Sequence, residues 1–300
     1  MVSSTGVQYR DRRTGEIVIE SVLYEPLLRW IYGHPAARKL IGLALNTAAF
    51  CWVYGKLQDL PGSRKKIPEF VARHRIDTEE AEFPVDHYRS FNAFFTRRLK
   101  PETRPFDRGP NVFCSPAEGK VQVVPRLEAN TRIPVKSASI PIASLLASES
   151  DARPYEGGSA LVIRLAPYDY HRFHFPDAGQ AGPARVIPGE YHVVSPIALA
   201  AFPGMFCLNK RTVTPFLSER FGQIGYVEIG GFTVATIVQT YTPGQVTRGQ
   251  EKGYFQFGGS TVILLFEPAT IVFDDDLIRD SEAGLEVQAQ VGSRIGRRHG

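Results

Sequence analysis

Residues 257–266 read Phe-Gly-Gly-Ser-Thr-Val-Ile-Leu-Leu-Phe, a pair of glycines followed by an apolar, partly β-branched run. Such a run, bounded by glycine, is typical of a buried strand. The simplest interpretation of the glycine pair is a hairpin turn between two strands. The alternative concerns the Gly259–Ser260 bond, because a serine hydroxyl beside an unhindered glycine carbonyl can attack it when a base is in reach. The peptide would then become an ester.

Similar short apolar runs, bounded by glycine and proline, recur through the last two thirds of the chain. They lie at 121–125, 161–165, 191–194, 224–229, 232–239, 261–266 and 271–273. Their length and alternation predict strands of a mostly antiparallel sheet, with one short helix around 142–147. We therefore expect an α+β fold, in which a helical N-terminal region (residues 1–105) precedes a β-rich, multi-layer domain (residues 106–300).

The helical region has recognisable start and stop signals. Residues 26–60 favour helix, with breaks expected at Gly33 and Pro35. Another helix is expected over 67–74, and Ser90 is a suitable N-cap for a further one.

The composition excludes several classes of protein. The 300-residue chain is 43% hydrophobic and 22% charged, with a formal net charge of +4. A disordered chain would be less apolar, and the 27 glycines and 22 prolines show no collagen-like triplet repeat. Cys51, Cys114 and Cys207 are odd in number and far apart, so they indicate neither a disulfide framework nor a zinc site. The weak net charge gives no indication of nucleic-acid binding.

Positive charge is concentrated in residues 26–66, which contain seven basic residues, five aromatic residues and a single acid, Asp59. Apolar helices with aromatic anchors and basic flanks are typical of segments that lie in a membrane interface. The alternative is a helical hairpin that packs on the domain and leaves its bases in solvent. The longest apolar run, about 40–55, is shorter than the roughly 20 residues that a spanning helix needs. The first twenty residues lack the pattern of a secretory signal.

Two further segments contain groups suited to acid–base chemistry. Residues 168–176 place His171 and His174 among aromatic residues. They are either an acid–base pair or one packed and one surface histidine, because an offset of three along a strand separates the rings. No cysteine or acidic cluster nearby supplies further metal ligands. Residues 114–120 contain Glu118, which is either a solvated carboxylate in a turn or a group that orients a histidine.

Together these segments resemble the phosphatidylserine decarboxylases, in particular the bacterial-type branch with a Gly-Gly-Ser-Thr maturation site. The resemblance extends over nearly the whole chain and is strongest over residues 258–267. It includes Ser-Phe-Asn-Ala-Phe-Phe-Thr-Arg at 90–97 and Asp-Tyr-His-Arg-Phe-His at 169–174. Further matching segments lie at 12–16, 165–167, 237–244 and 252–255.

The resemblance implies a self-processing lyase that is cut between Gly259 and Ser260. Ser260 would become a pyruvoyl group, so the cofactor would derive from the chain itself and need neither pyridoxal phosphate nor metal. The products would be a large chain, 1–259, and a small chain, 260–300. The ketone would form a Schiff base with phosphatidylserine and accept electrons as carbon dioxide leaves, which gives phosphatidylethanolamine.

The resemblance also assigns roles to individual residues and partners. The family's maturation histidine corresponds to His174, its decarboxylation histidine to His171, and its acid to Glu118, which would orient His174. A phospholipid substrate, a homodimer, and a peripheral location on the cytoplasmic side of the cell membrane are expected on the same basis, without a nucleic-acid partner.

The chain departs from the family at several positions. Glu118 stands where the family usually has aspartate, and its longer side chain makes Asp169 a possible substitute. Val193 replaces a small polar residue, and Phe232 and Ala235 add bulk. These differences either are absorbed by rearranged packing of the core or reshape the pocket for a different amine substrate. Two alternatives therefore stand beside the lipid decarboxylase. One is a pyruvoyl decarboxylase of a soluble amino acid or another serine lipid, and the other is a catalytically silent, membrane-binding relative.

Overall fold

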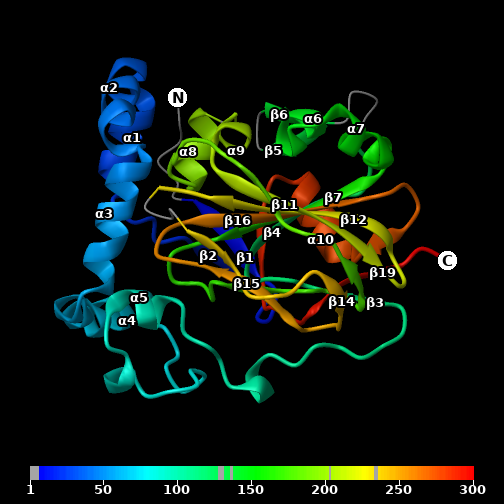
Figure 1. Cartoon of the computed structure of the whole chain (residues 1–300), viewed down its shortest axis with the longest axis horizontal. Coiled ribbons are helices and arrows are strands. Elements are labelled where there is room, and N and C mark those ends of the chain that lie inside the picture. The colour runs from blue at the N-terminus through cyan, green and yellow to red at the C-terminus, as the bar shows by residue number, and fades with distance from the viewer. Residues whose placement is uncertain (1–6, 128–131, 136–137, 203, 233–235) are drawn as a thin grey trace.

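The computed structural model describes residues 7–127, 132–135, 138–202, 204–232 and 236–300. A large sheet forms its centre (Figure 1), in which the one parallel pairing among the described strands joins β1 to β18. In spatial order the strands are β14 (Gly244–Val246), β9 (Gly179–Ala181), β11 (Arg211–Ser218), β12 (Gly222–Gly230), β16 (Ser260–Phe266), β7 (Ser159–Leu165), β4 (Gly119–Val124), β18 (Glu286–Ala289), β1 (Gln8–Asp11) and β2 (Ile17–Ile19), and β10 (Arg185–Ile187) pairs with β11. The predicted α+β class with a β-rich, mostly antiparallel part is confirmed.

Strand β16 lies in the middle of this sheet and is buried along its whole length. It pairs antiparallel with β12 on one side and with β7 on the other. Leu264 packs into one apolar core, whereas Ile263 and Leu265 pack into another on the opposite face. Because both faces are covered, the strand is apolar at consecutive positions rather than at alternate ones.

The two cores are closed by different elements. Small sheets and α10 cover one face, and short helices cover the other. The small sheets on the first face are β13 (Ile237–Gln239), β15 (Glu251–Phe255) and β8 (Arg172–His174), then β17 (Ile271–Phe273), β19 (Arg294–Arg298) and β3 (Val112–Cys114). The separate pair β5 (Arg132–Val135) and β6 (Ala138–Pro141) lies with the short helices, where Ile140 packs into the second core. The helices are α6 (Ile142–Leu146), α7 (Glu149–Ala152), α8 (Pro196–Ala201), α9 (Met205–Leu208) and α10 (Asp275–Glu282).

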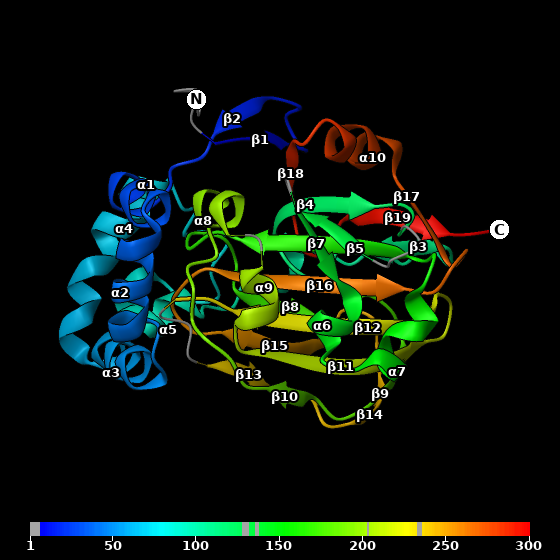
Figure 2. The same cartoon turned by 90° about the horizontal axis from the view of Figure 1, so that it is seen from above.

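The N-terminal helices stand together at one end of the sheet (Figures 1 and 2). They are α1 (Glu25–Gly33), α2 (Pro35–Leu45), α3 (Ala48–Asp59), α4 (Ile67–His74) and α5 (Phe91–Phe95), with 3-10 turns at Pro61–Lys66, Val85–His87 and Pro101–Thr103, and one at Arg153–Tyr155 further along. The predicted break at Gly33 and Pro35 is confirmed, and a second break follows α2. There the Thr47 hydroxyl accepts a hydrogen bond from the Phe50 amide at 3.2 Å and caps α3.

Residues of the N-terminal region are not all helical. Strands β1 and β2 precede α1 and extend the edge of the large sheet through the pairing of β1 with β18. None of the described helices is long and apolar enough to cross a membrane.

Three sequence expectations about strands were wrong. Residues 191–194 form no strand, because the His192 amide donates to the Asn209 side chain and the Val193 amide to the Tyr32 hydroxyl. Within the described part of the strand expected over 232–239, Phe232 lies in a turn and residues 237–239 form β13, whereas residues 233–235, which include Ala235, lie outside the described residues. The glycine pair makes no hairpin, since β15 and β16 belong to different sheets.

A buried ion-pair network ties the edge of the sheet to its centre. Arg164 on β7 donates to both carboxylate oxygens of Glu20 at 2.9 and 2.7 Å, and to both of Glu286 at 3.0 and 2.6 Å. All three side chains are at most 6% exposed. Removing one member of such a network leaves uncompensated charge in the interior.

Replacing Arg164→Gln is therefore expected to lower the free energy of unfolding by about 3–5 kcal/mol, measured by urea denaturation. The matched control is Arg185→Gln, which breaks the half-exposed pair of Arg185 with Asp151 and should cost less than about 1 kcal/mol. Equal losses in the two variants would contradict a stabilising role for the buried network.

Candidate active site

Ser260 is the first residue of β16 and is fully buried. The chain reaches it by crossing from the sheet of β15 into the large sheet, and both glycines are required on the way. Gly258 has a φ of 138°, and a Cβ on Gly259 would lie 2.8 Å from the carbonyl oxygen of Val194. An unhindered glycine carbonyl therefore stands directly before a buried hydroxyl.

The polar neighbour of this hydroxyl is His171. Its Nδ1 atom lies 3.4 Å from Ser260 Oγ, and its Nε2 atom lies 3.1 Å from the Ala166 carbonyl oxygen. A carbonyl only accepts hydrogen bonds, so this contact assigns the ring proton to Nε2 and leaves Nδ1 as the acceptor for the serine hydroxyl. His171 is thus oriented as a base toward Ser260.

Burial lowers the pKa of His171 to about 3, and the nearby charge of Arg97 acts in the same direction. The imidazole is therefore neutral at physiological pH, which is the state a proton acceptor needs. The ring of Phe95 stacks on it with centroids 4.0 Å apart and supplies part of this apolar environment.

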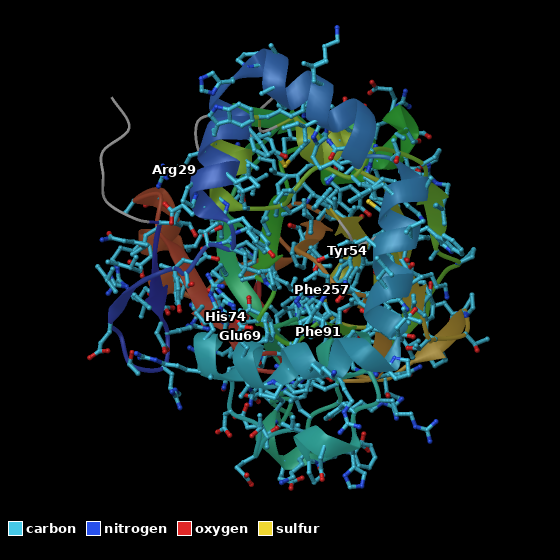
Figure 3. All side chains as sticks on the ribbon, turned by 90° about the vertical axis from the view of Figure 1, so that its left-hand side faces the viewer. Arg29, Tyr54, Glu69, His74, Phe91 and Phe257 are labelled. Atoms are coloured by element: carbon cyan, nitrogen blue, oxygen red, sulfur yellow. The ribbon has the colours of Figure 1, made fainter. Side chains whose placement is uncertain are left out.

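Helix α5 also fixes the segment that precedes the Gly259–Ser260 peptide. The Asn92 side chain accepts a hydrogen bond from the Phe257 amide at 3.0 Å and donates to Asp59 on α3 at 2.8 Å. In Figure 3, Phe257 lies between Tyr54 and Phe91, and its ring centroid is 6.1 and 5.1 Å from theirs. Sequence reasoning did not assign these roles to Asn92 and Phe95, although both belong to the 90–97 segment that carries the family resemblance.

His174 lies in a different part of the structure from Ser260. Its ring packs near those of Phe106 and Tyr170, and it lines a cavity of about 790 Å³ that includes neither Ser260 nor the glycine pair. Its buried Nδ1 atom has no hydrogen-bond partner among the described residues. Burial lowers the pKa of this histidine to about 4. The structure therefore brings His171, and not His174, to the serine hydroxyl.

Glu118 does not orient a histidine in this structure. Its carboxylate accepts from Arg104 Nε at 2.6 Å, and the same guanidinium pairs with Glu80 at 2.8 Å. The expected orienting contact between Glu118 and His174 is not formed; the carboxylate pairs with Arg104 instead. The arginine partner gave no signal in the sequence, since it lies in a loop after a proline-bounded turn.

Asp169 influences His171 indirectly, through the backbone of Ala166. Its carboxylate pairs with Lys120 at 2.9 Å and accepts from the Ala166 amide at 2.7 Å. The Ala166 carbonyl in turn holds His171 Nε2, so Asp169 fixes the turn that sets the imidazole's orientation. Among the described residues, no group of three histidine, cysteine, aspartate or glutamate side chains could hold a metal ion.

An apolar cavity of about 190 Å³ opens beside the glycine pair that precedes Ser260. Its walls come mainly from α1 and α2, and Gly258 and Gly259 form part of its floor. Val193 and Phe232, two of the positions at which the chain departs from the family, both line it. Phe232 also stacks on Phe50 of α3 with centroids 5.9 Å apart, so its bulk joins the helices to the site.

The chain is similar to a family model and to several known proteins over most of its length. A family model described as phosphatidylserine decarboxylase matches residues 91–297. The chain is 41% identical over 292 residues to the phosphatidylserine decarboxylase proenzyme of Chlamydia felis (strain Fe/C-56), covering 97% of this chain and 98% of that protein. It is 40% identical over 291 residues to the proenzyme of the same name from Clostridium botulinum (strain Langeland / NCTC 10281 / Type F), covering 97% and 99%. The corresponding Ruminiclostridium cellulolyticum protein is 38% identical over 291 residues, covering 97% of each.

The lowered pKa values of His171 and His174 predict an acid-sensitive fold. Because both values lie below the ordinary 6.5, the unfolded chain binds more protons than the folded chain between about pH 4 and 6.5. The free energy of unfolding should therefore fall as the pH is lowered from 7 to 5, by about 2 kcal/mol for each histidine.

Urea denaturation at the two pH values checks this, in a Ser260→Ala background that keeps every variant as one chain. His171→Asn and His174→Asn should each lose less stability between pH 7 and 5 than the parent does. The same change at exposed His87 controls for loss of a histidine. An unchanged pH dependence in both buried-site variants would show that these rings do not cause it.

Proposed function

Because the chain belongs to the phosphatidylserine decarboxylase family, we propose that it is a self-processing, pyruvoyl-dependent enzyme that converts phosphatidylserine to phosphatidylethanolamine and carbon dioxide. The family predicted from the sequence is confirmed by the family-model match and by the identity over nearly the full chain. The observation that supports the mechanism is the buried Ser260 hydroxyl, which faces a neutral His171 next to Gly259.

Self-cleavage would begin at the Ser260 hydroxyl. As its proton passes to a base, Oγ bonds to the Gly259 carbonyl carbon, the peptide C–N bond breaks, and the nitrogen of residue 260 takes up a proton. An ester then joins the two residues. Loss of the Ser260 α-proton and departure of the Gly259 carboxylate break this ester. Hydrolysis of the resulting dehydroalanine releases ammonia and leaves the pyruvoyl group.

The surroundings of residue 260 fit a pyruvoyl group. The position is buried, a neutral imidazole adjoins it, and an apolar cavity lies beside the preceding glycines. When present, the ketone would accept the electron pair of the bond between the substrate's α-carbon and its carboxylate as carbon dioxide leaves. His171 would hold or deliver a proton at this position, and the ring of Phe95 would exclude water from it.

The maturation step draws on a second histidine and an acid. Family resemblance assigns it to His174 and Glu118, and we retain both as candidates. For Glu118 to orient His174, its pair with Arg104 would have to open. The contact between His171 and Ser260 makes His171 the competing base, and the two assignments predict different cleavage phenotypes.

The helical end of the molecule suits peripheral attachment to a membrane. Large apolar side chains that are at least half exposed are concentrated there: Tyr24, Leu27, Trp30, Leu40, Trp52, Val53, Leu57 and Leu60. They lie on or next to α1, α2 and α3, the helices that also contribute residues to the cavity beside Gly259. A lipid held in the bilayer would thus reach the site from its own interface, on the cytoplasmic side, whereas a free amino acid would gain nothing from the exposed apolar surface.

Intact-mass analysis of purified variants tests the processing step. Wild-type protein is expected to yield chains 1–259 and 260–300, the latter with a blocked, ketone-bearing start, whereas Ser260→Ala should remain one chain. His174→Asn is expected to remain uncut. His171→Asn should be cut but lose decarboxylation of phosphatidylserine vesicles by about 10²–10⁴-fold.

The opposite pattern, in which His174→Asn is cut normally and His171→Asn is not, would assign the base to the histidine in contact with Ser260. An uncut wild-type chain that does not react with a hydrazide would contradict the pyruvoyl mechanism and support the catalytically silent alternative.

Flotation with phosphatidylglycerol-containing vesicles tests the membrane face. The double variant Leu40→Ser/Trp52→Ser removes two exposed apolar side chains, 69% and 61% exposed, that do not line the cavity. It is expected to lower the partition coefficient at least tenfold. Leu217→Ser is the matched control, since Leu217 is 59% exposed on β11, outside the helical region. Equal binding by the two variants would show that this face does not attach the protein to the membrane.

A further inference from the structure

The cavity beside Gly259 contains a single charged residue. Arg38 of α2 lines it, and the rest of its described lining is apolar except for tyrosine hydroxyls and the amide of Asn46. No acidic side chain contributes to the walls. A lone cation in an apolar pocket is expected to attract an anionic group of whatever occupies that pocket.

Arg38 has no carboxylate partner among the described residues. Its guanidinium carbon lies 4.4 Å from the ring centroid of Phe202, a cation–π contact that leaves the N–H donors at the edge of the guanidinium. Glu190 is engaged by His192, whose Nε2 atom lies 2.7 Å from its carboxylate. Arg29 on the preceding helix differs in this respect, since it pairs with Glu25.

The helix that carries Arg38 is held in place at its C-terminal end. Asn46, which caps α2, contacts His192 Nδ1 through its side-chain nitrogen at 2.9 Å. On the preceding helix, the Tyr32 hydroxyl accepts a hydrogen bond from the Val193 amide at 3.2 Å. Both contacts anchor the helices to the segment that also packs against Gly259, so Arg38 has a defined position relative to the scissile peptide.

We propose that Arg38 forms the phosphate subsite of the enzyme and selects amine substrates that carry a phosphodiester. This inference rests on the proposed function. In a serine phospholipid, the phosphate lies between the reacting amino acid and the acyl chains. Arg38 likewise lines an apolar cavity that reaches Gly259, the residue before Ser260. Arginine binds phosphate oxygens through two parallel N–H donors, which gives geometric specificity as well as affinity.

The carboxylate of the substrate is a poorer partner for Arg38. That group must leave as neutral carbon dioxide, and an ion pair with it would stabilise the ground state more than the transition state. A phosphodiester keeps its charge throughout the reaction, so an ion pair with it adds binding affinity without opposing the chemistry.

Binding to the uncut Ser260→Ala chain isolates the subsite from catalysis. Calorimetry would compare dihexanoylphosphatidylserine with O-hexylserine, which keeps the amine and carboxylate but lacks the phosphate. Arg38→Gln is expected to weaken binding of the phospholipid at least about tenfold and to leave O-hexylserine within twofold. Arg38→Lys should recover part of the loss, because it keeps the charge but not the paired donors.

Lys39→Gln is the matched control. Lys39 is the adjacent, exposed base on the same helix and does not line the cavity, so it reports the effect of net charge alone. A loss at Arg38→Gln that exceeds the loss at Lys39→Gln by about tenfold supports a local phosphate contact. Equal losses in the two variants would reduce the effect to general electrostatics and overturn the proposal.

Two other outcomes are equally decisive. If Arg38→Gln weakens both ligands to the same degree, the arginine binds the carboxylate and the phosphate subsite is refuted. If the otherwise wild-type chain is cut and active on phosphatidylserine vesicles while Arg38→Gln shows unaltered KM and binding, the subsite fails but the enzyme's function stands. An uncut wild-type chain instead contradicts the proposed function itself.

Discussion

The crossing of residues 256–259 from one sheet to another is the constraint on which the site depends. A strand pairing would have fixed both sides of the Gly259–Ser260 peptide in a regular ladder, whereas the crossing frees the preceding segment to turn at Gly258 and pack closely at Gly259. Ser260 then enters the centre of the sheet, where burial is complete. The same burial lowers the pKa of His171, so a single placement brings a buried hydroxyl and a neutral imidazole into contact.

The N-terminal helices contribute to this placement as well as to the surface. Asn92 holds the Phe257 amide and also bonds Asp59 at the end of α3, so the exposed helical end and the scissile segment share one hydrogen-bonded connection. Aromatic rings from α3, α5 and the crossing pack together there. The cavity walled by α1 and α2 also reaches Tyr54 of α3 and the crossing, so it joins the helical end to the segment before Ser260.

The sequence was sufficient for elements whose signals are local. The strands β4, β7, β12, β16 and β17, the helix breaks around Gly33, and the Ser90 cap follow from periodicity and capping chemistry. It was insufficient where the local structure depends on partners that are distant in the sequence. Residues 191–194 look like a strand, but side chains of Tyr32 and Asn209 take up their amides. The glycine pair looks like a hairpin because nothing local shows that its flanking strands belong to different sheets.

The same distinction applies to the site residues. Motif resemblance indicated Ser260, His171, His174 and Glu118, but spacing along the chain could not show which histidine contacts the serine. That choice depends on the turn fixed by Asp169 and Ala166. Likewise, the pairing of Glu118 with Arg104 depends on a loop that returns from the helical region.

The position of β16 determines how the two fragments would behave after cleavage. Residues 260–300 supply the middle strand of the large sheet, β18 inserts between two strands of the longer chain, and β19 pairs with β3 of that chain. Cutting the backbone at 259–260 would therefore not allow the fragments to part, since separation would require dismantling both cores. Denaturation, however, would be hard to reverse, because the two pieces would have to meet again in solution. Recovery would then be bimolecular and depend on concentration, unlike that of the precursor.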